Sequence, residues 1–152
     1  IERLSQALGR VRAEGHTLFV GGNGGSHAVA IHWGVDLPKV ARIDTITLGA
    51  NPSLMTALAN DLDYQVCLST ELVLRARQGD VFVALSCSGR SNNIVAAVKE
   101  ARKLWMPTFL ITGATAPEYH EVCVIRIMSD NYGILEDVFS AIGHHLAQNL
   151  RT

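Results

Sequence analysis

The sequence predicts an α/β protein with a single doubly wound domain, in which helices flank a five-stranded parallel sheet. Apolar runs rich in β-branched residues alternate with helix-like segments along the 152-residue chain. Most of these runs are continuous rather than alternating in polarity. Continuous runs are expected for parallel strands that helices cover on both faces. In a domain of this kind, ligands bind at the carboxyl ends of the strands.

Strands and helices largely alternate after an opening helix, with two helices before the third strand and no helix between the last two strands. The expected strands are at 17–20, 45–48, 81–85, 108–111 and 122–127. The expected helices are at 2–14, 26–37, 52–60, 64–77, 92–103 and 132–150. No internal repeat, low-complexity stretch or linker interrupts the sequence, so one domain is expected to span 1–152.

The composition argues against several classes of protein. The chain has 13 Lys and Arg, 14 Asp and Glu and no basic run, which disfavours a nucleic-acid surface. No apolar run approaches the roughly 20 residues of a membrane helix. Cys67, Cys87 and Cys123 are widely spaced and odd in number, so neither a disulfide framework nor a thiolate zinc site is indicated. A cytoplasmic protein is expected and, because the chain opens with Ile1, a fragment of a longer one.

Two loops of similar design follow the first and third expected strands. Residues 21–26 read Gly-Gly-Asn-Gly-Gly-Ser, and residues 86–91 read Ser-Cys-Ser-Gly-Arg-Ser. Each loop opens a helix, whose N-terminus offers free backbone N–H groups and the positive end of the helix dipole. Together they predict a site for a polyhydroxylated anion, most simply a sugar phosphate.

Neither loop matches a common nucleotide-binding motif. A dinucleotide-binding fingerprint requires glycine where His27 stands, and no Walker G-K-[ST] occurs. The glycines could also serve the backbone of a tight turn alone. However, a plain turn needs one N-cap serine at most, whereas Ser86, Ser88 and Ser91 can surround a phosphate. Arg90 could assist, although an exposed arginine at a loop tip is the simpler interpretation.

Polar residues interrupt two otherwise apolar helices. His32 and Asp36 share one face, and Glu136, Ser140 and His144 step by four along another helix. Buried imidazoles and carboxylates are costly unless they are paired or bound to a metal. One interpretation is therefore a site for a zinc-like divalent ion, and the other is a His–Asp and a Glu–His pair. Glu136 and His144 lie roughly 12 Å apart along the helix, so an ion bound by all four residues would require more than one subunit.

These motifs resemble those of the sugar isomerase (SIS) domain family, specifically its phosphoheptose isomerase branch. The resemblance covers nearly the whole chain. Its strongest segments are 22–27, His32-x-x-x-Asp36, 59–61, 79–81, 86–91 and 110–113. It implies a homotetrameric aldose–ketose isomerase that interconverts sedoheptulose 7-phosphate and D-glycero-D-manno-heptose 7-phosphate. The N-terminal helix that is usual in the family is expected to be shortened here. The apolar helices 26–37 and 132–150 also favour a homotetramer, with sites at subunit contacts.

The resemblance also implies a role for individual residues. Sugar contacts are expected from Asn23, Gly24, Gly25, Asn60 and Asp61, with Asp36 and Glu136 also touching the substrate. Phosphate contacts are expected from Ser86, Cys87, Ser88 and Ser91. A zinc ion would be held by His32, Asp36, Glu136 and His144. The catalytic base is expected to be Asp36 or Glu136, and the acid His144.

The sequence departs from the family pattern at several positions. Asp36 replaces a glutamate, Glu136 replaces a glutamine and Gly133 replaces an acidic residue, while residues 114–117 read Ala-Thr-Ala-Pro instead of a second glycine pair. The alternative function is therefore a non-catalytic SIS module that binds a sugar phosphate or a protein partner, such as a replication initiator. Such interaction proteins tend to lack the full set of metal-site residues. Here all four positions carry groups that can bind a metal, which favours the enzyme.

Overall fold

A five-stranded, fully parallel sheet forms the centre of the molecule, as the sequence predicts. The computed structural model describes residues 1–151. The strands are β1 (Leu18–Gly21), β2 (Thr45–Thr47), β3 (Val81–Ser86), β4 (Thr108–Thr112) and β5 (Cys123–Arg126). Their order is β2-β1-β3-β4-β5. The chain leaves β1 toward one edge and returns to build the other, so the sheet is doubly wound about the β1–β3 boundary.

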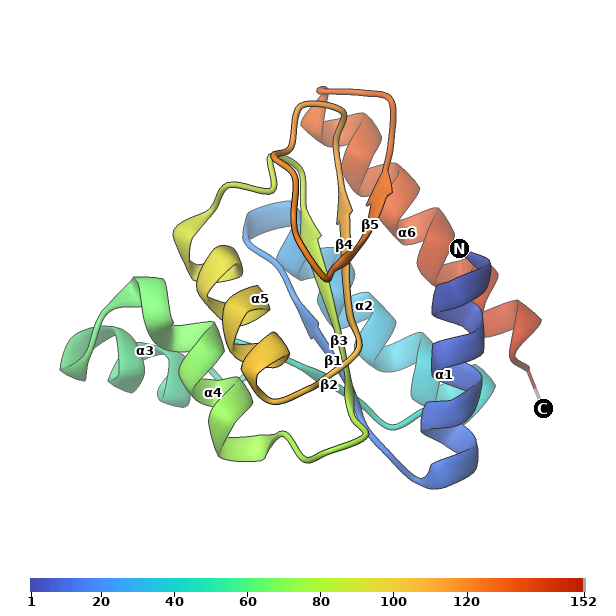
Figure 1. The fold of residues 1–152 in the computed structure, drawn as a ribbon, viewed down its shortest axis with the longest axis horizontal. Coiled ribbons are helices and arrows are strands. Elements are labelled where there is room, and N and C mark those ends of the chain that lie inside the picture. The colour runs from blue at the N-terminus through green and yellow to red at the C-terminus, as the bar shows by residue number, and fades with distance from the viewer. Residues whose placement is uncertain (152) are drawn as a thin grey trace.

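Helices cover both faces of this sheet (Figure 1). They are α1 (Glu2–Glu14), α2 (Gly24–Ala41), α3 (Pro52–Asp61), α4 (Cys67–Arg75), α5 (Asn92–Lys103) and α6 (Tyr132–Asn149), with a 3₁₀ turn, η1 (Tyr64–Val66), before α4. Helices α1, α2 and α6 lie on one side, and α4 and α5 on the other with α3 outermost. Among residues 1–151, no helix is long and apolar enough to cross a membrane.

The sheet separates two apolar cores, which explains the continuous apolar runs. In β3 every residue is buried. Val81, Val83 and Leu85 face the core under α1, α2 and α6, whereas Phe82 and Ala84 face the core under α4 and α5. Successive strand residues point to opposite faces, so a strand covered on both sides needs apolar residues at every position.

Helix α2 is longer than the sequence predicts. The expected helix ends at residue 37, before Pro38, but the observed helix continues to Ala41. A proline within a helix removes one backbone hydrogen bond but keeps a helical φ angle. The buried side chains of Leu37 and Ala41 hold the last turn against the core. The expected helix 64–77 is likewise divided into η1 and α4.

Candidate functional site

The two similar loops meet at the carboxyl ends of β1 and β3, where the sheet reverses its winding. Gly21 pairs with Ala84 across these two strands, so the segments that follow them are neighbours. Together with the start of α6 they form a small pocket with a cavity volume of about 80 Å³. Sites that enclose a whole small molecule usually measure about 300–1,000 Å³, so this pocket suits one end of a ligand. It is lined by Asn23, Ser26, Leu85, Ser86, Cys87, Ser88, Ser91, Tyr132 and Glu136.

Hydroxyl groups of the second loop are oriented by the backbone of the same loop. The Ser86 hydroxyl oxygen accepts a hydrogen bond from the Gly89 N–H at 3.2 Å, and the Ser88 hydroxyl accepts from the Arg90 N–H at 3.2 Å. Each hydroxyl therefore keeps its own proton to donate to a ligand. Ser91 is the N-cap residue of α5, so a ligand beside it also meets the start of that helix.

The loop that contains residues 115–119 holds the second loop through two hydrogen bonds. Arg90 donates a hydrogen bond to the Thr115 carbonyl at 2.7 Å, and the Tyr119 hydroxyl donates to the Gly89 carbonyl. Arg90 is exposed and directed toward residue 115. This agrees with the simpler interpretation of its role, because the guanidinium holds the loop rather than lining the pocket.

Two glycines of the first loop, Gly22 and Gly25, have other atoms close to their Cα. A Cβ atom at Gly22 would lie 2.7 Å from the Ser26 carbonyl carbon and oxygen, so only glycine fits the turn into α2. At Gly25 a Cβ atom would lie 2.2 Å from the Glu136 carboxylate. The absence of a side chain there leaves room for the Glu136 carboxylate, which thereby reaches the pocket.

Glu136 brings a carboxylate into a pocket otherwise lined by neutral groups. The Ser26 hydroxyl donates to the Glu136 carboxylate at 3.3 Å and lies 3.6 Å from the Cys87 sulfur. Burial raises the pKa of the Cys87 thiol above its ordinary value, so the thiol stays protonated at neutral pH. Cys87 therefore lines the pocket as an uncharged side chain and is not a nucleophile.

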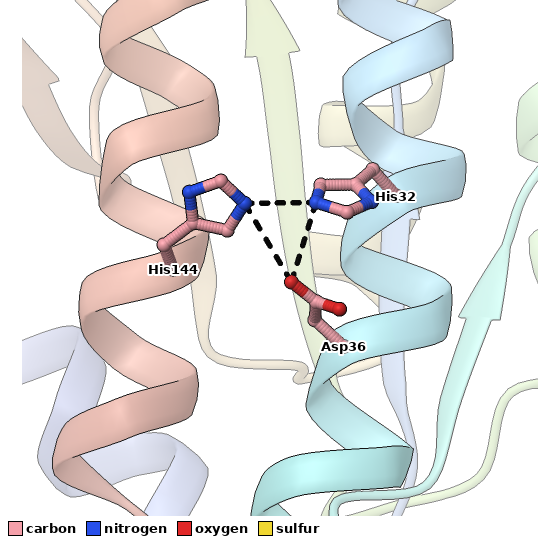
Figure 2. A group of neighbouring side chains, drawn as sticks. All are labelled: His32, Asp36 and His144. Atoms are coloured by element: carbon pink, nitrogen blue, oxygen red, sulfur yellow. Dashed lines mark hydrogen bonds and ion pairs between the residues drawn. The ribbon is translucent and has the colours of Figure 1, made fainter.

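Three of the four predicted metal ligands lie together at the middle of α2 and α6 (Figure 2). The Nε2 atoms of His32 and His144 are 2.8 Å apart. The same carboxylate oxygen of Asp36 lies 3.2 Å from His32 Nε2 and 3.6 Å from His144 Nε2. We refer to these three side chains as the His–Asp–His group. Their ligand atoms all lie within 4.8 Å of one another, which allows them to share a metal ion.

The spacing within this group fits a tetrahedral ion. Metal–ligand bonds of about 2.0–2.2 Å at tetrahedral angles place neighbouring ligand atoms about 3.3–3.6 Å apart. The three observed separations are 2.8, 3.2 and 3.6 Å. Two imidazoles and one carboxylate with an open fourth position also match the donor set of catalytic zinc sites.

Close packing of α2 against α6 brings the group together. Trp33, next to His32, is fully buried, and its indole N–H donates to the Phe139 carbonyl at 3.0 Å. Gly143, next to His144, leaves room for this indole, since a Cβ atom there would lie 2.1 Å from the indole nitrogen. The contact between Trp33 and Gly143 therefore sets the distance between the two imidazoles.

Several predicted site residues lie elsewhere. Glu136 is directed at Ser26 and the pocket, outside the His–Asp–His group. Gly24 borders a neighbouring cavity, and Asn60 and Asp61 lie exposed at the end of α3, where the Asn60 amide donates to the Asp61 carboxylate. Within the single chain the side chains of His32 and His144 are 46% and 53% exposed, so the fold of one subunit does not bury them. They lie on the outer faces of their helices.

Sequence reasoning also missed parts of the pocket. Ser26 and Tyr132 both line the pocket. Ser26 lies in the first loop but was given no role of its own, and in the helix that begins at Tyr132 only Glu136 and His144 were predicted as site residues. Asn93 and Tyr64 both hydrogen bond to Asn23. Nothing in the sequence signals these bonds, because they join residues 70 and 41 positions apart.

Comparison with known proteins identifies the family of the chain. The family model of the SIS domain matches residues 1–113. The chain is 35% identical to a phosphoheptose isomerase of Rhodospirillum rubrum over 143 residues, which cover 90% of this chain and 76% of the relative. It is 32% identical to that of Maridesulfovibrio salexigens over 148 residues, 93% and 72% of the two chains.

A solved structure extends the likeness to the fold. The phosphoheptose isomerase of Neisseria gonorrhoeae matches with a TM-score of 0.89 at 22% identity, over 98% of this chain and 84% of that one. The chain is therefore an SIS domain protein. Within this class it belongs to the phosphoheptose isomerase family, and thus to a family of isomerase enzymes.

Proposed function

We propose that the protein interconverts sedoheptulose 7-phosphate and D-glycero-D-manno-heptose 7-phosphate. The observation that carries this proposal is the arrangement of two kinds of site along the same pair of helices. The serine-lined pocket lies at the first turns of α2 and α6, and the His–Asp–His group lies further along both helices. A substrate with a phosphate at one end and a reactive carbonyl at the other can use both.

The separation of the two sites suits a seven-carbon sugar. An α-helix rises about 1.5 Å per residue, which places His32 about 9 Å beyond Ser26 and His144 about 12 Å beyond Glu136. An extended chain advances about 1.2 Å per bond, so phosphorus and C2 of a 7-phosphorylated ketose are about 8 Å apart. With its phosphate among the serines, the sugar would bring C1 and C2 near the His–Asp–His group.

The proposed reaction moves protons only. The Asp36 carboxylate removes a proton from C1, and the C–H electrons form the C1–C2 double bond of an enediol as His144 protonates O2. Return of a proton to C2, with loss of the proton on O1, gives the aldose. One carboxylate oxygen of Asp36 faces both imidazoles, while the other points away from them (Figure 2). This second oxygen is the proposed proton acceptor.

A zinc ion fits the proposal as a cofactor. His32, Asp36 and His144 would hold it. Bound through the Nε2 atom of His144, such an ion would take over from that imidazole the stabilisation of the negative charge on O2, because a coordinated nitrogen has no proton to donate. We assign Glu136 to the pocket rather than to this ion, because its carboxylate is directed at Ser26. Metal analysis of protein purified without chelator tests the assignment, with His32→Ala expected to lose the bound metal and Glu136→Gln to retain it.

Two variants separate the two candidate bases. Asp36→Asn keeps the shape of the side chain but cannot accept the proton, so turnover of sedoheptulose 7-phosphate should fall by at least about a hundredfold. Glu136→Gln should remain active, and it should bind the phosphorylated sugar more tightly because it removes a negative charge beside the phosphate. Loss of turnover in Glu136→Gln with an active Asp36→Asn would reverse the assignment.

The alternative is a non-catalytic module that binds a sugar phosphate or a protein partner. A wild-type protein that binds sedoheptulose 7-phosphate and a metal ion, but turns over no phosphorylated sugar, would establish this alternative. The His–Asp–His group favours the enzyme, since sugar binding alone needs no cluster of metal-binding side chains.

We further propose a cytoplasmic homotetramer. Ile31 and Val35 on α2 are 44% and 53% exposed, and Ile134 on α6 is 52% exposed. These apolar side chains are exposed on the same two helices as His32 and His144, and a second subunit packed on these helices would cover them. Free thiols at all three cysteines are in keeping with a reducing compartment. Light scattering should give four times the monomer mass, and a monomer at micromolar concentration would contradict the assembly.

A further inference from the structure

A chain of hydrogen bonds connects the two loops of the pocket through a residue that does not line it. Asn93, in the first turn of α5, is only 2% exposed. Its side-chain amide pairs with that of Asn23 in both directions, and both N···O distances are 2.8 Å. Asn23 is the N-cap residue of α2 and lines the pocket. The pair therefore joins the starts of α2 and α5.

The backbone determines which way both amides face. The Ile94 N–H can only donate, and it donates to Oδ1 of Asn93 at 3.0 Å. Oδ1 of Asn93 is thereby identified as the oxygen, so Nδ2 of Asn93 must be the donor to Asn23. Oδ1 of Asn23 accepts this bond and a second one from the Tyr64 hydroxyl at 3.0 Å. Both acceptor positions of Asn23 are then occupied.

This orientation limits what Asn23 can offer a ligand. One of its two amide N–H groups donates to Asn93. Within residues 1–151 the other has no protein acceptor. We propose that Asn93 is a positioning residue that presents Asn23 to the pocket as a donor only, so that Asn23 recognises an oxygen of the sugar that accepts a hydrogen bond. This inference rests on the proposed function, because it takes the bound ligand to be a phosphorylated sugar.

The test compares four variants with the wild type: Asn93→Ala, Asn23→Ala, the double variant and, as a matched control, Asn92→Ala. Asn92 is the same residue type in the same helical turn but is exposed. Calorimetry gives the Kd for sedoheptulose 7-phosphate, and kinetics give KM and kcat. Asn93→Ala and Asn23→Ala should each weaken sugar binding about tenfold, the equivalent of one hydrogen bond. Asn92→Ala should bind as the wild type does.

The double variant distinguishes positioning from a general structural role. If Asn93 acts through Asn23, the double variant binds the sugar no more weakly than Asn23→Ala alone. A further tenfold loss in the double variant, or unchanged binding in Asn93→Ala, would overturn the inference. Inorganic phosphate, which the serine hydroxyls would bind, should keep its affinity in all four variants. A variant that is merely misfolded loses phosphate as well.

The same measurements separate this inference from the proposed function. Wild-type protein that binds the sugar without turning it over refutes the isomerase, and the Kd values still decide the role of Asn93. Normal turnover and binding in Asn93→Ala refute only the positioning role. Wild-type protein that does not bind the sugar at all overturns both.

Discussion

The pocket and the His–Asp–His group are built in different ways, although both use α2 and α6. The serine hydroxyls of the pocket are held by the backbone of their own loop, since Ser86 and Ser88 accept N–H groups three and two positions away. The His–Asp–His group instead joins residues up to 112 positions apart, and it exists only because two helices pack closely. Local chemistry therefore orients the serines of the anion site, whereas long-range packing brings His144 to the metal site.

This contrast also appears in burial. Ser86 is 5% exposed and Cys87 is 7% exposed, whereas the imidazoles of His32 and His144 are about half exposed. A phosphate binds more strongly when its hydrogen-bond donors are already held in place inside a concave pocket. An exposed group of ligands on the outer face of two helices is accessible to a metal ion, to substrate and to a second subunit. Substitutions that affect one site should thus leave the other largely intact.

The largest expected effect is loss of anion binding when two hydroxyls of the pocket are removed. Ser86→Ala combined with Ser88→Ala deletes two donors to a charged group, each contributing about 1.5–3 kcal/mol. Affinity for the phosphorylated sugar should fall by at least about a hundredfold in calorimetric titration. Metal content should stay unchanged. Full affinity in the double variant would remove this loop from the site.

A smaller effect is expected at the packing contact behind the His–Asp–His group. Gly143→Ala places a methyl group against the buried indole of Trp33, so α2 and α6 must separate. Overpacking of this kind costs about 1–3 kcal/mol, which chemical denaturation measures. Metal affinity should fall as the imidazoles move apart, and inorganic phosphate should still bind.

A matched glycine serves as the control for this substitution. Gly9 lies within α1, and a Cβ atom there would meet nothing within 4 Å. Gly9→Ala should therefore stabilise the protein by about 0.5–1 kcal/mol through helix propensity and leave metal binding unchanged. Equal metal affinity in Gly143→Ala and Gly9→Ala would refute the packing argument.

The smallest effect concerns pH and His27, which lies next to the first loop. Burial lowers the pKa of His27 below its usual value of 6.5, against the opposing influence of the Glu71 charge. Between the folded-state pKa and 6.5, the unfolded state binds more protons than the folded state. Stability is therefore lost as the pH falls through this window.

His27→Asn should reduce the loss of unfolding free energy between about pH 7 and pH 5. The control is His145→Asn, which changes a histidine on the exposed side of α6. Identical pH dependence in both variants and the wild type would contradict this.

The pattern of the sequence was enough to predict a doubly wound parallel sheet and the two loops that form the pocket. Continuous apolar runs require strands that are covered on both faces, and ligands bind such sheets at the carboxyl ends of the strands, where the loops after β1 and β3 lie side by side. The spacing of His32 and Asp36 also follows from helical periodicity, because it lies within one element.

The way side chains from distant elements combine became apparent only from the packing of the folded chain. Glu136 and His144 lie on one helix, yet Gly25 admits the first to the pocket while Gly143 brings the second toward His32. The Asn23–Asn93 pair likewise depends on the distance between two helix starts. Periodicity assigns a residue to a face of its own helix, but the contacts of that face depend on how closely two elements pack, and small residues far away in the sequence set that distance.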